Sequence, residues 1–102
     1  MAATPEAKVK KKVTEQLKKL NAYYFYAFTG GYGSSGVPDI IGCYRGYFFA
    51  IECKAGKNKP TALQEKQLRE IVKAGGEAIV INEENVDEVT AWLLRLEESA
   101  KA

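Results

Sequence analysis

The chain has 102 residues, of which 46% are hydrophobic and 27% are charged, and its formal net charge is +2. This composition is typical of one globular domain with a modest core. No apolar run approaches the roughly 20 residues of a membrane-spanning helix, and the first residues lack the apolar segment of a signal peptide, so no membrane partner is expected. The absence of histidine excludes catalysis by a histidine base and zinc sites built on histidine.

Positive charge is concentrated in the first three quarters of the chain. Residues 1–20 carry six lysines and two acids, residues 21–76 have a net charge of +3, and residues 77–102 have a net charge of −5. A basic region of this length fits an anionic polymer such as DNA, although a solvated helix face would have the same composition. Cys43 and Cys53 make neither a disulfide framework nor a metal motif, and predict apolar strand positions in a reducing cytoplasm.

The first predicted element is a helix that begins at Thr4-Pro5-Glu6, where a hydroxyl N-cap, a proline and an acid follow one another. Four apolar residues and one glutamine then recur at helical spacing and form a stripe: Val9, Val13, Gln16, Leu17 and Leu20. Glu6 falls on this stripe, whereas Glu15 points nearly the opposite way. Glu6 is therefore either an acid that faces a site or a first-turn residue that complements the helix dipole.

Residues 22–28 are dominated by tyrosine and phenylalanine and predict a strand. We expect most of this strand to be buried on both faces, with stacking of its rings on bases as the alternative. Residues 29–36 are rich in glycine and predict a flexible loop. Its Ser34 and Ser35, together with backbone amides, are candidates to donate hydrogen bonds to a nucleic-acid phosphate.

Residues 39–44 and 46–54 predict two strands joined by a short turn at Arg45-Gly46. Pairing around that turn sets Tyr44 near Tyr47 and brings Asp39 close to Glu52. Side chains alternate across a strand, so Glu52 and Lys54 share a face with the apolar residues that precede them. The hairpin is therefore expected to gather two carboxylates and one ammonium at the same end.

Two carboxylates and a lysine at strand ends are suited to a hard divalent metal and to attack on a phosphodiester. Charges at the end of a buried face are costly unless they pair or bind an ion. The alternative is that Glu52 and Lys54 are surface charges where a strand leaves the sheet. The Pro38-Asp39 step and the glycine-rich loop before it favour the metal site.

The rest of the chain predicts a helix, a strand and a last helix. Thr61 and Gln64 match a capping box and open the second helix, whose buried side we expect to contain Leu63, Leu68, Ile71 and Val72. Residues 77–82 predict a fourth strand, and Asn85 with Glu88 predicts the cap of the last helix. The resulting order is α-β-β-β-α-β-α in one domain spanning residues 1–102.

Several segments together resemble the VRR-NUC domains of the PD-(D/E)xK nuclease superfamily, in their small stand-alone form similar to Holliday-junction resolvases. The resemblance covers roughly residues 5–95. It rests on Pro5-Glu6, residues 36–41, residues 46–54, Gln64 and residues 74–76. It implies an α/β protein with a restriction-endonuclease-like core, in which helices flank a mixed four-stranded sheet.

The resemblance also implies a function and a set of site residues. Asp39, Glu52 and the backbone carbonyl of Cys53 would bind Mg²⁺ or Mn²⁺, and Lys54 would orient or activate the attacking water. Glu6 would lie near a second metal or its waters, and Gln64 would match the family's glutamine in the second helix.

We therefore expect a metal-dependent DNA endonuclease, acting as a homodimer on four-way or otherwise branched DNA in a bacterial or phage-infected cell. A non-catalytic nucleic-acid-binding module and a nuclease of linear duplex remain the alternatives. For the dimer interface, the aromatic strand of residues 23–28 and the helix that carries Trp92 are both candidates.

Overall fold

A computed structural model of the chain describes residues 4–27 and 36–101. The predicted order α-β-β-β-α-β-α is confirmed, with a short 3-10 helix, η1, before the last helix. In chain order the elements are α1 (Pro5–Lys19), β1 (Tyr23–Tyr26), β2 (Ile40–Tyr44), β3 (Tyr47–Cys53), α2 (Ala62–Lys73), β4 (Glu77–Ile81), η1 (Val86–Glu88) and α3 (Val89–Lys101).

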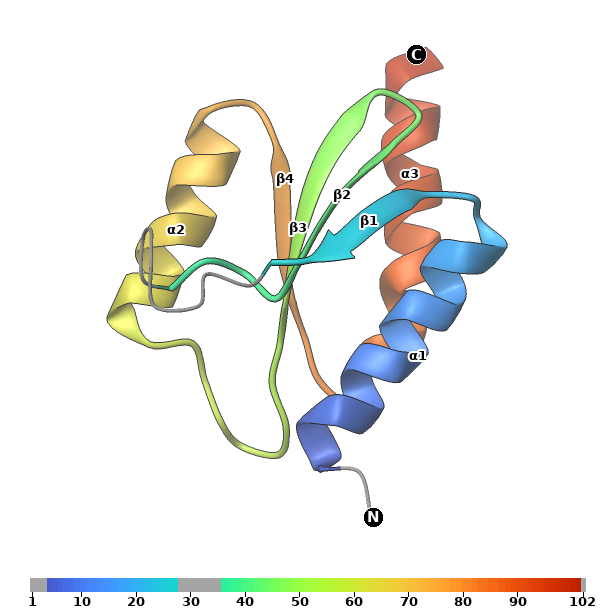
Figure 1. Cartoon of the computed structure of the whole chain (residues 1–102). Coiled ribbons are helices and arrows are strands. Elements are labelled where there is room, and N and C mark those ends of the chain that lie inside the picture. Colours follow the sequence, from blue (N-terminus) through green and yellow to red (C-terminus); the bar gives the residue numbers. More distant parts are fainter. Residues whose placement is uncertain (1–3, 28–35, 102) are drawn as a thin grey trace.

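The four strands form one mixed sheet in the order β1-β2-β3-β4. The first three strands are antiparallel, and β4 runs parallel to β3. Helices α1 and α3 cover one face of the sheet and α2 lies on the other (Figure 1). The predicted mixed four-stranded sheet flanked by helices is therefore confirmed.

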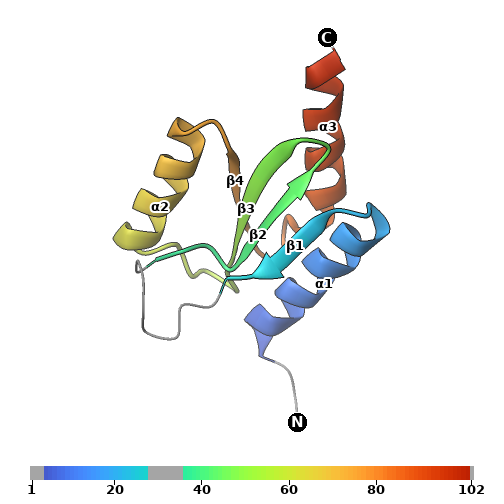
Figure 2. The same cartoon turned by 45° about the horizontal axis from the view of Figure 1, so that its top comes forward.

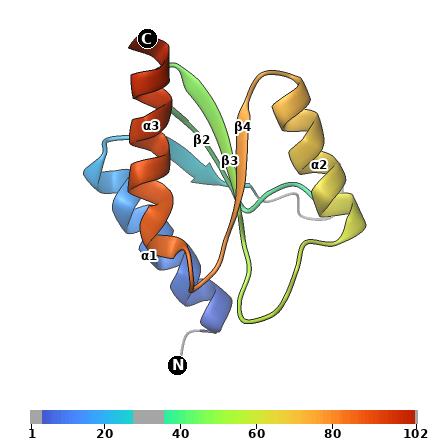
Figure 3. The same ribbon diagram turned by 180° about the vertical axis from the view of Figure 1, so that it is seen from behind.

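The hydrophobic core lies between the sheet and the pair α1 and α3, which lie side by side on one face of it (Figure 3). The glutamine of the predicted stripe joins these two helices: Gln16 Nε2 donates to the Val86 carbonyl at 2.7 Å, and Gln16 Oε1 accepts from the Thr90 amide at 3.0 Å. The fully buried core side chains include Val13, Leu17, Phe49, Ile51, Cys53, Val89 and Leu93.

The prediction for the aromatic strand is wrong in burial. Strand β1 ends at Tyr26, and Tyr23 is 70% exposed. The reason is that β1 is the edge strand farthest from α2 (Figure 2), so α2 does not cover it. Only the face of β1 that is turned toward α1, with Tyr24, reaches the core. Phe28 and the loop residues Ser34 and Ser35 lie outside the described residues.

The prediction for α2 is right about its start and wrong about part of its buried side. The capping box of Thr61 and Gln64 is present. Leu63 and Val72 are more than half exposed, and no residue of α2 is fully buried. Helix α2 packs mainly against the edge strand β4, so part of the apolar stripe of α2 stays exposed to solvent.

The predicted cap of the last helix is also wrong. Asn85 Oδ1 accepts from the Asn82 amide at 2.8 Å, and its Nδ2 donates to the Val80 carbonyl at 3.1 Å. The side chain thus closes the turn after β4, and η1 intervenes before α3. Within the described part of the chain, no helix is both long and apolar enough to cross a membrane.

Candidate active site

The β2–β3 hairpin brings the two candidate acids to one end of the sheet. Tyr44 pairs with Tyr47 and Ile40 pairs with Ile51, which confirms the predicted register. Continued by one residue, this register sets Asp39, just before β2, opposite Glu52 near the end of β3. The candidate site therefore lies at the end of the central strands that is near the first residues of α1 and α2.

Asp39 is fixed by the backbone of the neighbouring strand. Its Oδ2 accepts a hydrogen bond from the Cys53 amide at 2.8 Å. Its Oδ1 lies 3.6 Å from the ammonium of Lys10, on α1. Gly36, in the segment before Asp39, has a φ of +80°, and a Cβ added there would lie 2.6 Å from the Leu63 carbonyl carbon. Only glycine allows this close approach, and it seats the segment before Asp39 on the start of α2.

Glu52 is a buried acid, only 2% exposed, with one partnered oxygen. Its Oε2 lies 3.3 Å from the Lys54 ammonium, whereas Oε1 is buried with no hydrogen-bond partner in the described structure. Burial, followed by the negative charge of Asp39, raises the pKa of Glu52 to about 7, although Lys54 and, to a smaller extent, the backbone amide of Asp39 oppose the shift. A buried carboxylate oxygen without a partner, beside a second carboxylate, destabilises the fold, and a bound cation would lower that cost.

Cys53 contributes its backbone rather than its thiol. Its side chain is fully buried in the core, and burial, followed by the charge of Asp39, raises the pKa of the thiol to about 12. A neutral buried thiol is neither a nucleophile nor a metal ligand at ordinary pH. The amide of the next residue, Lys54, donates to the Ile81 carbonyl at 2.9 Å, so β4 holds this end of β3 in place.

Glu6 reaches the site through a lysine that the sequence interpretation missed. The Lys10 ammonium lies 3.7 Å from Glu6 Oε2, one helical turn away, as well as 3.6 Å from Asp39. Burial disfavours the charged lysine, but the charges of Asp39 and Glu6 outweigh it and raise the pKa of Lys10. The sequence did contain a signal for Lys10: it lies four residues after Glu6, a spacing at which opposite charges pair on a helix, and it borders the apolar stripe.

Gln64 serves the start of α2. Its Oε1 accepts from the Thr61 amide at 2.9 Å, and Thr61 Oγ1 accepts from the Gln64 amide at 3.2 Å. This is the reciprocal capping box, which satisfies two amides that a helix start leaves unpaired. Gln64 also lies beside Gly36, and its hydrogen bonds belong to the helix cap rather than to the two carboxylates.

The donor set fits a hard divalent cation that keeps several of its waters. Among the residues that the structure describes, no three acidic, histidine or cysteine side chains gather into a complete metal site. Asp39 and Glu52 nevertheless supply two carboxylates, and Mg²⁺ is commonly bound by one or two carboxylates, with water completing an octahedron. The buried, unpartnered Oε1 of Glu52 is the observation that favours this fit.

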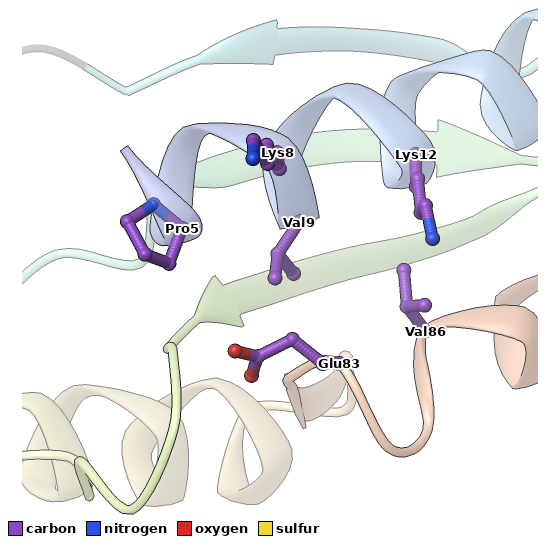
Figure 4. Close-up of a pocket in the computed structure, with 6 residues that line it drawn as sticks. All are labelled: Pro5, Lys8, Val9, Lys12, Glu83 and Val86. Atoms are coloured by element: carbon purple, nitrogen blue, oxygen red, sulfur yellow. The ribbon is translucent and has the colours of Figure 1, made fainter. Parts of the chain in front are cut away.

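A separate pocket of about 300 Å³ lies on the other flank of α1 (Figure 4), lined by Pro5, Lys8, Val9, Lys12, Glu83 and Val86. Its one acid has a structural role, because both oxygens of Glu83 accept from the Gly56 amide, at 2.9 and 3.1 Å. Glu83 thereby ties the turn after β4 to the basic connector of residues 54–59, which follows the site. Lys57 and Lys59 on this connector are exposed.

Comparison with known proteins gives a consistent result. A family model described as archaeal Holliday junction resolvase (Hjc) matches residues 26–100. A solved structure named VRR_NUC domain has a TM-score of 0.72 and 25% identity, covering 85% of this chain and 95% of that one. Another, a VRR_NUC domain protein, has a TM-score of 0.69 and 24% identity, covering 91% and 88%, and shows the likeness of fold.

No curated protein matches the sequence. The family model nevertheless spans well over half of the chain, and the structural neighbours share its mixed sheet and flanking helices. The chain therefore belongs to the archaeal Holliday junction resolvase (Hjc) family and is a VRR-NUC-type nuclease domain of the PD-(D/E)xK kind.

Proposed function

We propose that this protein is a divalent-metal-dependent endonuclease that hydrolyses DNA phosphodiesters, with residues 1–102 forming one nuclease domain. The observation that carries the proposal is the buried Glu52, whose Oε1 has no hydrogen-bond partner in the described structure and which lies beside Lys54 and across from Asp39. Such an acid is costly in an apolar fold unless a cation neutralises it.

Asp39, Glu52 and the Cys53 carbonyl would hold Mg²⁺ or Mn²⁺. A bound ion of this kind lowers the pKa of a coordinated water and neutralises charge on the scissile phosphate. Lys54 positions the attacking water and stabilises the negative charge that develops on the phosphate. Water adds to phosphorus as the bond to the 3′ oxygen breaks, which leaves a 5′-phosphate and a 3′-hydroxyl.

Glu6 and Gln64 have supporting roles in this proposal. Glu6, on the first turn of α1, is connected to Asp39 through Lys10 and would hold a water or a second ion near the phosphate. Gln64 caps α2 beside the segment that leads to Asp39. The thiols of Cys43 and Cys53, neither of which forms a disulfide, fit a reducing cytoplasm in a bacterial or phage-infected cell.

The DNA partner is proposed to be a four-way or otherwise branched junction. Lys57 and Lys59 extend the basic charge of the chain next to the site, which suits a polyanion. Opposed strands of a junction are related by approximate two-fold symmetry, so two copies of one site on a two-fold axis would match them. A homodimer is therefore part of the proposal.

The uncovered side of the sheet is the better of the two candidate dimer interfaces. Tyr23, Cys43 and Phe48 stand in one row across β1, β2 and β3, and all three are exposed. Trp92, in contrast, packs edge-on against Phe49, with ring centroids 6.3 Å apart. An exposed apolar row is typical of an interface, whereas Trp92 belongs to the packing of α3 on the sheet.

Light scattering at micromolar protein is expected to give twice the 11.3 kDa mass of one chain. Tyr23→Ser combined with Phe25→Ser is expected to shift the mass toward that of the monomer, because two exposed apolar contacts are lost. Leu94→Ser, on the exposed side of α3, serves as the control and is expected to leave the dimer intact. A monomeric wild type would contradict this part of the proposal.

Cleavage of a labelled four-way junction is expected with Mg²⁺ or Mn²⁺ and to stop when the cation is chelated. Junction, flap and linear duplex substrates should be compared at the same salt concentration, because binding to phosphates depends on salt. Preferred cutting of the junction supports the proposal. Equal cutting of all three would instead indicate a nuclease of linear duplex, and binding with no cutting in either metal would indicate a non-catalytic module.

A further inference from the structure

The two acids of the site differ in what their oxygens contact. One oxygen of each acid contacts a residue at or just after the end of β3. Asp39 Oδ2 accepts from the Cys53 amide, and Glu52 Oε2 pairs with the Lys54 ammonium. The other oxygen of Glu52 has no hydrogen-bond partner in the described residues, but the other oxygen of Asp39 faces Lys10. A metal ion shared by these acids would therefore meet a cation already present at Asp39 Oδ1.

Lys10 is placed to balance negative charge when no metal is bound. Its ammonium lies 3.6 Å from Asp39 Oδ1 and 3.7 Å from Glu6 Oε2, and its side chain is only 30% exposed. The distances are those of ion pairs rather than of tight hydrogen bonds. A lysine ammonium is a compact charge on a flexible four-carbon stem, so it can leave one carboxylate without moving the helix.

We propose that Lys10 is a placeholder cation, which pairs with Asp39 Oδ1 in the metal-free protein and gives this oxygen up when a divalent cation binds. This inference rests on the proposed metal site and adds a residue that regulates it. Lys10 acts through Asp39 and is therefore a positioning residue. With Lys10 in this role, the protein keeps a folded, charge-balanced site without metal, but a higher cation concentration is needed to fill the site.

Two opposite effects follow from removing the ammonium. Without metal, Asp39 and Glu6 lose a balancing charge, so the folded state is less stable. With metal, the divalent cation no longer competes for Asp39 Oδ1 and no longer approaches a neighbouring positive charge. A purely structural lysine would produce the first effect and leave the second unchanged, so the two measurements together identify the role.

The test compares Lys10→Met with Lys11→Met, which removes the same charge from an exposed neighbouring position of α1. Thermal unfolding is followed during titration with Mn²⁺ or Ca²⁺, in the absence of DNA. Lys10→Met is expected to lower the metal-free unfolding temperature by about 2–5 °C and to lower the cation concentration at half-maximal stabilisation roughly three- to tenfold. Lys11→Met is expected to leave both values near those of the wild type.

The possible outcomes separate this inference from the metal site itself. If the wild type is stabilised by the cation and Lys10→Met shows the same half-maximal concentration, or a higher one, the placeholder role is wrong while the site stands. If neither cation stabilises the wild type, the proposed metal site fails and this inference fails with it. Lys10→Gln is a second variant that keeps a polar side chain, and the same lower half-maximal concentration is expected for it.

Discussion

Asp39→Asn and Glu52→Gln are each expected to lower the rate of junction cleavage by about a thousandfold or more, with the fold retained. Both changes keep the size of the side chain and remove the negative charge that would hold the cation, so the charge stabilisation of the reaction is lost. Single-turnover cleavage with saturating enzyme measures the chemical step separately from DNA binding. Circular dichroism before and after thermal unfolding checks that the variants are folded.

The matched control for these acids is Glu15→Gln, which removes the same charge from an exposed position of α1 away from the site. Its rate is expected to stay close to that of the wild type. The double variant of Asp39 and Glu52 is expected to be hardly slower than either single variant, because the two acids act as one unit. Cleavage by Glu52→Gln at the wild-type rate would remove the buried acid from the proposed mechanism.

Lys54→Met is expected to reduce the cleavage rate by about a hundred- to a thousandfold while stabilisation by cations persists. The reason is that Lys54 contacts Glu52 and is assigned to the attacking water and the phosphate, not to the metal. Lys54→Arg is expected to restore only part of the rate, because a planar guanidinium directs its donors differently from an ammonium. Single-turnover rates and thermal unfolding with Mn²⁺ measure the two effects separately.

Lys57→Met is the control for Lys54, since this exposed lysine lies on the same connector. Its loss is expected to weaken DNA binding and reduce the salt dependence of binding, with the rate at saturation unchanged. If Lys54→Met behaved in the same way as Lys57→Met, Lys54 would be a DNA-binding residue and would have no part in the chemical step.

The site hairpin could be predicted because its signals are local. Side chains alternate strictly along a strand, and the short turn at Arg45-Gly46 fixes the register. The pairing of Tyr44 with Tyr47 then determines that of Ile40 with Ile51, and with it the approach of Asp39 to Glu52. Local pattern was equally sufficient for the capping box of Thr61 and Gln64.

What the sequence could not supply depends on contacts between distant segments. Lys10 pairs with Asp39 across 29 positions of the chain, and nothing near either residue indicates that contact. The exposure of Tyr23 follows from the position of α2, which leaves the β1 side of the sheet uncovered. Asn85 bonds to Val80 and Asn82 instead of capping a helix, because side-chain amides can satisfy either arrangement.

The hydrogen bond from the Cys53 amide to Asp39 makes the acid depend on the main chain of its neighbour and not on that neighbour's side chain. Any small apolar residue that fits the core between Glu52 and Lys54 would present the same amide to Asp39. The Cys53 thiol is buried, and burial protects it from oxidants that attack ionised sulfur.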